Sequence, residues 1–201
     1  GEARGVQQTF ANRDLRQFGK LSMYIHAENA VKEPNNIQDG ELNAIVRVGT
    51  DFAGNYYEVK IPLRLTELDA ATRLDPNSDA YNDTLWIPLN SLDLDLNLLP
   101  KLKAERSASG SPLNRPYRQL QPNGHTYSIM GDPNLGEIRG ILIGVENAGN
   151  PKACGEIWVN ELRMTSINEQ AGYAAMARAD ITLADLGTIT ASVAMHTTGF
   201  G

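Results

Sequence analysis

Cysteine is almost absent from this chain, since only Cys154 occurs among its 201 residues. A single cysteine excludes an internal disulfide framework and a zinc site built on paired cysteines. Its sequence neighbours Ala153, Gly155 and Glu156 include no histidine or cation that would favour a thiolate. We therefore expect Cys154 to be a small packed residue and not a nucleophile.

Long apolar runs and clusters of positive charge are missing as well. No apolar run is long enough for a transmembrane helix, and no basic segment leads into an apolar stretch as in a signal peptide. The 18 Lys and Arg are scattered and the formal net charge is −6, which argues against nucleic acid and anionic lipid as partners. Because the chain begins with Gly1 and stops directly after a strand-like segment, we expect a fragment of a longer protein.

Histidines and glycines do not form a recognisable binding motif. His26, His125 and His196 lie far apart, so no two of them share a strand or helix at metal-ligand spacing. The segment Gly131–Glu137 contains glycines but lacks the Lys-Ser/Thr pair and the following helix of a phosphate loop. We interpret it as a turn.

Carboxylates and serines give no catalytic set either. Asp93 and Asp95 would share one face of a strand, where they could hold calcium or act as an acid/base pair, but a solvated surface is the favoured interpretation. Ser107, Ser109 and Ser111 have no base near them in the sequence. We predict no catalytic residue, no cofactor, no metal and no enzymatic activity.

What the sequence does contain is short runs of Val, Ile, Leu, Tyr and Thr, separated by turns rich in its 18 Gly and 10 Pro. This pattern predicts a mostly β fold. The clearest strand is 20–28, where apolar and polar residues alternate. The buried face is expected to hold Leu21, Met23, Ile25 and Ala27, and the solvent face Lys20, Ser22, Tyr24 and His26.

Further strands are predicted at 41–50, 56–63, 84–89, 138–145 and 156–164. The first two are expected to form a hairpin, and the last two to lie together in a central sheet. Leucine spacing predicts one short helix near 97–106, and the Gly- and Pro-containing segment 107–123 is expected to be a long mobile loop. Residues 1–166 are thus predicted to form a jelly-roll-like antiparallel β-sandwich.

Residues 167–201 differ in composition and are predicted to form a β-hairpin that is part of a larger β-barrel. Two segments of about ten residues alternate apolar and polar positions, as strands crossing a bilayer do. A soluble amphipathic hairpin would show the same alternation, so the pattern alone leaves both interpretations open. The residues predicted to face lipid are Ile181, Leu183, Ile189 and Val193.

Aromatic residues offer an alternative function, a carbohydrate-binding jelly-roll module of a surface protein. Tyr57 and Tyr117 are the candidate ligand-facing rings, with Tyr56 and Tyr81 as further possibilities. Trp86 and Trp158 also belong to this set, but they stand inside apolar runs. We therefore expect both tryptophans to pack in the core.

Several longer segments carry a family resemblance. They are QQTFANRDLRQF (7–18), the strand 20–28, ACGEIWVNELR (153–163), RADITLADLGT (178–188) and HTTGFG (196–201). Together they resemble the SprA/Sov family, the giant outer-membrane translocon of the type 9 secretion system. The resemblance runs from Val6 to Gly201 and is strongest after Cys154, whereas 66–123 matches no quoted motif.

This resemblance implies an internal piece of a very large β-barrel through which folded cargo proteins leave the periplasm. It implies an outer-membrane location and a link to gliding motility, with the sandwich on the periplasmic side or at the cell surface. The implied partners are the secreted cargo, a PorV-like barrel and a plug subunit. The family offers no catalytic residue to transfer.

Overall fold

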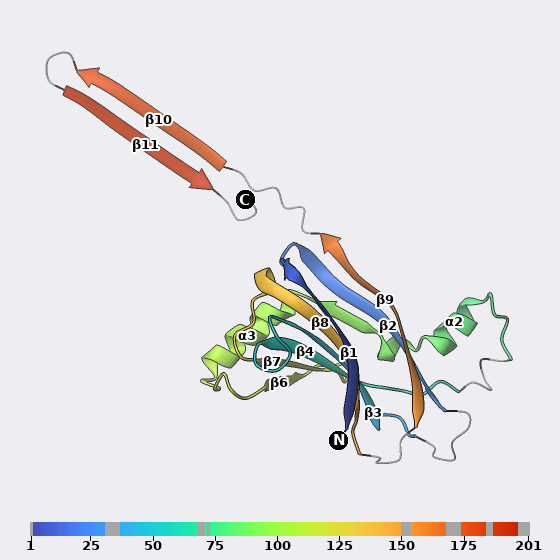
Figure 1. The fold of residues 1–201 in the computed structure, drawn as a ribbon. Coiled ribbons are helices and arrows are strands. Elements are labelled where there is room, and N and C mark those ends of the chain that lie inside the picture. The colour runs from blue at the N-terminus through green and yellow to red at the C-terminus, as the bar shows by residue number, and fades with distance from the viewer. Residues whose placement is uncertain are drawn as a thin grey trace. The chain divides into compact units, whose positions relative to one another are not determined.

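The computed structural model describes residues 2–30, 37–67, 71, 73–149, 154–167, 174–183 and 187–196 (Figure 1). Contacts between residues divide the chain into two compact units, Gly1–Ile167 and Asn168–Gly201. The first unit contains two sheets and the helices, and the second contains a hairpin.

Two antiparallel sheets form the first unit. The larger sheet, in the order β1-β8-β3-β4-β7-β6, consists of β1 (Ala3–Arg13), β3 (Leu42–Gly49), β4 (Tyr56–Pro62), β6 (Tyr117–Leu120), β7 (Thr126–Met130) and β8 (Ile138–Asn147). The smaller sheet, in the order β5-β2-β9, consists of β2 (Phe18–Asn29), β5 (Leu92–Asp95) and β9 (Gly155–Ile167). The chain crosses between the sheets after β1, β2, β4, β5 and β8. The predicted mostly β, antiparallel sandwich is confirmed.

The core lies between the sheets, where the alternation of β2 and β3 points the apolar side chains inward. The inward residues of β2 are at most 2% exposed, which confirms the predicted buried set of Leu21, Met23, Ile25 and Ala27. The predicted hairpin is also confirmed, because β3 pairs with β4. Burial of these apolar side chains is the main stabilising contribution to the sandwich.

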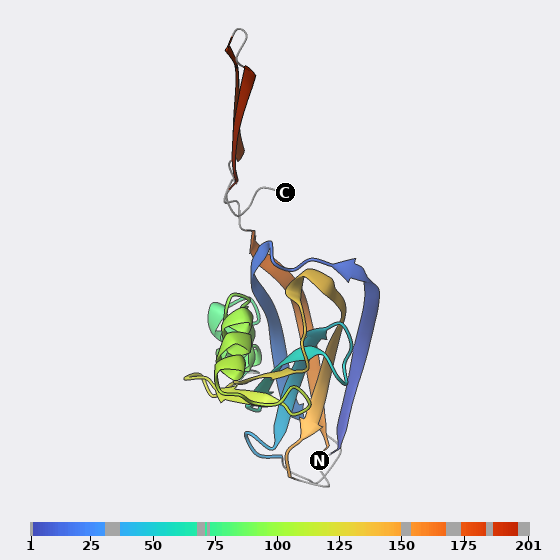
Figure 2. The same ribbon diagram turned by 90° about the vertical axis from the view of Figure 1, so that its left-hand side faces the viewer.

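Helices and short 3-10 turns accompany the sheets, and those with described bounds are α2 (Asp79–Leu85), η1 (Pro88–Asn90), α3 (Leu98–Ala108) and η2 (Leu135–Glu137). The helix predicted near 97–106 is confirmed as α3, whose Leu99 and Leu102 are buried. Helix α3 contacts β5 and β7, and Figure 2 shows it beside one edge of the sandwich with β1 at the opposite edge.

The prediction of a strand at 84–89 is wrong, because this segment contains the end of α2 and the start of η1. Helix α2 begins where the Ser78 side chain accepts a hydrogen bond from the Tyr81 amide at 3.1 Å. This N-cap contact satisfies an amide that lacks a partner within the helix. The short apolar run 85–87 has the composition of a strand, but it pairs with no neighbouring strand.

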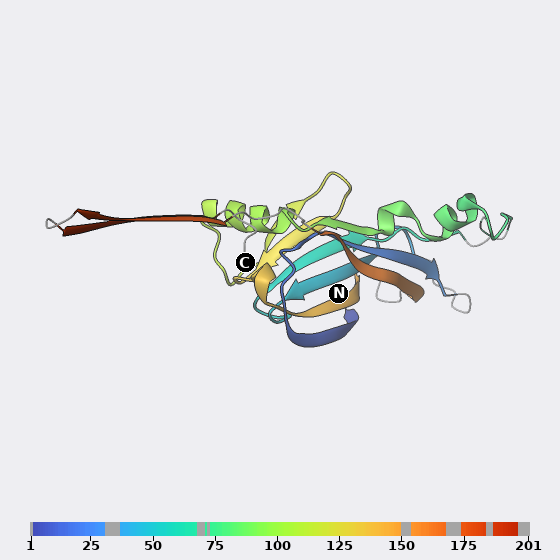
Figure 3. The same ribbon diagram turned by 90° about the horizontal axis from the view of Figure 1, so that it is seen from above.

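Two further expectations about strands are wrong. The segment 107–123 is not one long loop, because it contains β6, which pairs with β7. The strands at 138–145 and 156–164 do not share a sheet: β8 lies between β1 and β3, whereas β9 is the edge strand beside β2. Figure 3, seen from above, shows β2 and β9 in one layer and β1 at the far edge of the other.

The second unit is an antiparallel hairpin of β10 (Ala174–Leu183) and β11 (Gly187–His196), paired along their full length. Asp180 accepts from the Thr190 hydroxyl at 2.7 Å and forms an ion pair with Arg178 at 2.9 Å. The turn between the strands lies outside the described residues.

Candidate functional site

A groove of about 570 Å³ lies on the outer face of the smaller sheet. Strand β2 forms its floor, α2 and η1 form one wall, the middle of β9 forms the other wall, and β5 closes one end. Sites for small molecules commonly have volumes of roughly 300–1,000 Å³. The groove therefore has the dimensions of a small-ligand site.

The wall formed by β9 is shaped by a β-bulge. Between the pairs Ser22–Arg163 and Tyr24–Asn160, strand β9 contains one residue more than β2. At this point Glu161 has a φ of 54°, in the left-handed region that residues other than glycine seldom adopt. Bulges redirect side chains, and here Asn160, Glu161 and Arg163 all line the groove.

Two aromatic rings form the apolar part of the groove. Tyr24 rises from the floor with 38% of its surface exposed, and Trp86 comes from the end of α2. Their ring centroids are 6.1 Å apart at an interplanar angle of 58°. The guanidinium carbon of Arg163 lies 5.6 Å from the Tyr24 ring centroid, and its Nη2 donates to the Tyr24 hydroxyl at 3.3 Å. The tyrosine ring is thus held in place by a cation from the opposite wall.

Both cations of the groove are paired with carboxylates. Lys20 Nζ lies 2.7 Å from Asp93 Oδ1, and Arg163 Nη1 lies 3.1 Å from Glu161 Oε2. All four side chains are between 43% and 59% exposed, so each pair contributes little to stability. Their consequence is local: the positive charge of the groove is neutralised and its polar groups are oriented.

Buried polar contacts fix the wall formed by α2 and η1. Asn90 is fully buried, its Nδ2 donates to the Arg64 carbonyl at 2.8 Å, and its Oδ1 accepts from the Arg64 amide at 2.7 Å. The side chain thereby satisfies both backbone groups of one residue, which would be costly to leave unpaired in the interior. The start of β5 is held against the chain that follows β4.

A second buried contact holds the end of α2 on the sheet. His26 Nδ1 lies 2.8 Å from the Leu85 carbonyl, which can only accept, so Nδ1 carries a proton. Nε2 lies 2.9 Å from Glu28 Oε2, and both side chains of this contact are buried. The expectation that His26 faces solvent is wrong, because Leu85, Trp86 and Trp158 surround it. The ring centroid of His26 lies 6.1 Å from that of Trp86 and 5.5 Å from that of Trp158.

The ligand-facing rings suggested by the sequence lie elsewhere. Tyr57 is 2% exposed, its hydroxyl donates to the Pro133 carbonyl at 3.3 Å, and burial raises its pKa to about 12. Tyr117 is half-buried and packs against the core. A ring enclosed in the core offers no face to a ligand, so Tyr57 is not available for the role suggested for it.

The tryptophans also differ from expectation. Trp158 was expected in the core but is 57% exposed, because β9 is an edge strand. Trp86 is half-buried and lines the groove. The sequence did carry one useful signal, since the alternation of β2 placed Tyr24 on the solvent side.

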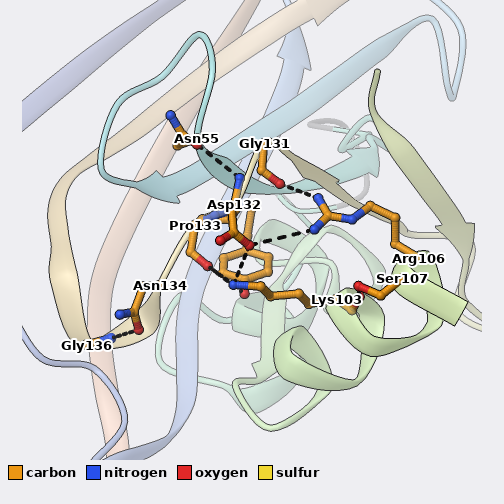
Figure 4. Close-up of polar contacts among 10 residues, drawn as sticks. Asn55, Lys103, Arg106, Ser107, Gly131, Asp132, Pro133, Asn134 and Gly136 are labelled. Atoms are coloured by element: carbon orange, nitrogen blue, oxygen red, sulfur yellow. Dashed lines mark hydrogen bonds and ion pairs between the residues drawn. The ribbon is translucent and has the colours of Figure 1, made fainter. Parts of the chain in front are cut away.

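The loop at 131–136 ties α3 to the sandwich (Figure 4). The carbonyl of Gly131 accepts from Arg106, which is buried, and the Asp132 carboxylate lies 2.7 Å from Lys103 Nζ. The hydrogen bond from Lys103 lowers the pKa of Asp132 from its ordinary value. With a carboxylate in this position, the loop is unsuited to a phosphate group.

Other candidate residues make structural contacts. Asp93 and Asp95 do share the exposed face of β5, where Asp93 pairs with Lys20 and Asp95 accepts from the Asn97 amide at 2.9 Å. Within the described residues, no group of three or more His, Cys, Asp or Glu side chains is placed to hold a metal ion. Cys154 is exposed, so the expectation that it is packed is wrong.

The second unit contains the residues predicted to face lipid. Val193 is 68% exposed in the hairpin taken by itself. The backbone register pairs Ile181 with Ile189 and Leu183 with Gly187. The orientation of these side chains toward lipid stays a prediction.

Comparisons with known proteins complete this description. No helix in the described part of the chain is long and apolar enough to cross a membrane. A search of curated proteins gave no match. The family model SprA_N, described as motility related/secretion protein, matches residues 1–201.

Proposed function

Because the chain belongs to the SprA_N family of motility-related and secretion proteins, we propose that it is a structural domain of a giant outer-membrane β-barrel, the translocon of type 9 secretion. In this proposal the sandwich is a non-catalytic scaffold and the hairpin is part of the barrel wall. Folded cargo proteins pass through the barrel, and a PorV-like barrel and a plug subunit are its partners. Cargo export in turn supports gliding motility.

The observation that carries the proposal is the register of the hairpin. Ten residues of β10 pair with ten residues of β11, and all pairs on one face join apolar residues or glycine. The middle of the other face joins polar residues, next to the pair of Met176 and Ala194. The apolar pairs include 177 with 193, 179 with 191 and 181 with 189, and the polar pairs include 178 with 192, 180 with 190 and 182 with 188. A tilted strand of roughly ten residues is enough to cross the hydrocarbon layer. The two faces fit a wall between lipid and an aqueous lumen.

The exposure of side chains supports the same proposal. Val193 and Met195 are 68% and 61% exposed in the hairpin by itself. Water is an unfavourable surrounding for such an apolar face. Lipid on one side, and neighbouring barrel strands along both edges, would remove this exposure and pair the strand edges.

The test is a pair of neighbouring substitutions in the parent protein, made in the bacterium that produces it. Val193→Lys places a charge on the apolar face, and Ser192→Lys is the matched control on the polar face. A lysine on the lipid face of a barrel destabilises it by about 2–4 kcal/mol at mid-membrane. We expect Val193→Lys to reduce both the amount of folded barrel in the outer membrane and the amount of secreted cargo, and Ser192→Lys to leave both near wild type. Equal behaviour of the two variants contradicts the proposal.

A further inference from the structure

The groove on the outer face of β5, β2 and β9 has no part in the proposed scaffold role. We propose that it binds a saccharide chain of low net charge, with Tyr24 and Trp86 as the stacking surface. Polar side chains from α2 and β9 would bind the hydroxyl groups. The inference concerns the first unit and does not depend on the hairpin.

The two rings suit the apolar face of a pyranose. One face of a pyranose ring carries several C–H groups, and the negative face of an aromatic ring attracts them. Tyr24 is 38% exposed, and Trp86 stands at 58° to it across a centroid distance of 6.1 Å. Two tilted rings form a corner that contacts a sugar from two sides, within a groove of about 570 Å³.

The polar side chains of the groove suit the edge of the same sugar. Asn82 and Asn160 bring amides from opposite walls, each with both donors and an acceptor. Glu161 and Arg163 are planar groups already oriented by their contact at 3.1 Å. Groups held in position before binding lose less freedom when the ligand arrives. Vicinal hydroxyls, which both donate and accept, match this mixture.

The charge arrangement favours a ligand of low net charge. Lys20 is paired with Asp93, and Arg163 with Glu161. An anionic ligand would have to compete with these carboxylates for their cations, and it would also be repelled by the carboxylate of Asp83, which lines the same groove. A neutral polyol can accept and donate at the same groups without separating either pair.

The backbone of the floor argues against an extended peptide as the ligand. Peptides that bind sheets commonly add a strand at a free edge. The floor strand β2 is already paired on both sides, with β5 through Lys20 to Met23 and with β9 along most of its length. On the floor of the groove, recognition must therefore come from side chains, and the free edges of this sheet are those of β5 and β9.

The experiment uses the full 201-residue chain and three probes: a β-1,4-linked tetramer of N-acetylglucosamine, a β-1,4-linked tetramer of glucose, and a proline-rich decapeptide. Binding is followed by calorimetry and by NMR shifts of the Trp86 indole N–H at ligand concentrations up to about 10 mM, which detects Kd values into the millimolar range. The two tetramers distinguish binding of an N-acetylated aminosugar chain, of the kind found in cell walls, from binding of a glucose polysaccharide.

Variants locate the binding. Tyr24→Ala is expected to weaken saccharide binding about tenfold, and Asn82→Ala with Asn160→Ala tests the polar walls without removing any buried group, since both asparagines are exposed. Trp158→Ala is the control for an exposed tryptophan of the same sheet that does not line the groove. Because its ring lies 5.5 Å from that of His26, the variant is used only if its thermal unfolding matches that of the unaltered chain. Thermal unfolding checks that each variant is folded.

Binding of either tetramer that is weakened by Tyr24→Ala and by the asparagine variants, but not by Trp158→Ala, supports the proposal and identifies the saccharide type. Three results overturn it. They are the absence of binding by both tetramers, binding that depends on Trp158 and not on Tyr24, and binding of the decapeptide alone.

Discussion

Strands β2 and β11 have the same alternation of apolar and polar residues but opposite surroundings. In β2 the inward side chains of Leu21, Met23, Ile25 and Ala27 are at most 2% exposed, because the larger sheet covers them. In β11 the apolar Val193 and Met195 are 68% and 61% exposed in the hairpin by itself. The alternation thus identifies an apolar face in both strands, but it does not identify what covers that face.

The outer faces of the two strands differ as well. The polar side of β2 holds a buried pair, His26 and Glu28, which the end of α2 covers. The polar side of the hairpin holds the pair of Arg178 and Asp180, in which both side chains are about half exposed or more. A buried pair is strongly destabilised when one partner is removed, whereas an exposed pair is not.

The largest expected effect comes from the apolar faces. Ile25→Ala should lower the free energy of unfolding of the sandwich by about 4 kcal/mol, because a fully buried side chain leaves a cavity. Val193→Ala should change it by less than about 0.5 kcal/mol. Urea unfolding of the 201-residue chain measures both. Similar losses in the two variants would show that the hairpin's apolar face is covered within this chain.

The buried pair of β2 should give the next largest effect. Glu28→Ala removes the partner of a buried imidazole and is expected to destabilise the sandwich by about 3 kcal/mol. Asp180→Ala removes the partner of Arg178 in an exposed pair and should leave the unfolding of the sandwich unchanged. The same urea series tests this, and a harmless Glu28→Ala would show that the His26 contact does not hold α2 on the sheet.

A smaller effect is expected from acid. The pKa of Asp51 is lowered to about 2, first by the Gly54 amide and then by the Asn55 side chain. A lowered carboxyl pKa stabilises the fold above the unfolded value near 4, and this contribution is lost as the pH falls toward 2. Because Asp51 is largely in solvent, the contribution is about 1 kcal/mol.

Asp51→Asn should therefore flatten the loss of stability between about pH 4 and pH 2. Asp180→Asn, which changes a carboxylate of the second unit, is the control. It should leave the acid unfolding of the sandwich unchanged. An unaltered acid profile in Asp51→Asn would contradict the assignment.

Much of the fold follows from local pattern, and the exceptions have physical causes. Strands β2, β3 and β4 were predictable because one face of each is buried, and α3 because Leu99 and Leu102 face the core. Strand β1 lacks a buried face, since nearly all of its residues are exposed, so it shows no alternation. The placement of β8 and β9 in different sheets depends on pairing with strands distant in the sequence, and the sequence of neither segment indicates its partner.

The groove was less predictable than the fold. Alternation placed Tyr24 on the outer face, but its neighbour Trp86 arrives from a helix about sixty residues later. The bulge at Glu161 and the cover over His26 also depend on contacts between distant segments. The sequence therefore suggested Tyr57 as a ligand-facing ring, although the folded sandwich buries it.

The most direct test of the central claim measures which face of the hairpin meets lipid. The experiment uses the parent protein with Cys154→Ser and with any further cysteine also replaced. In this background, Val193→Cys and Ser192→Cys are made separately, and each carries a nitroxide label in native outer membranes. If the hairpin is barrel wall, oxygen should relax the label at 193 more than a water-soluble nickel complex does, and the order should reverse at 192. Equal accessibility of both positions to the nickel complex would contradict the account.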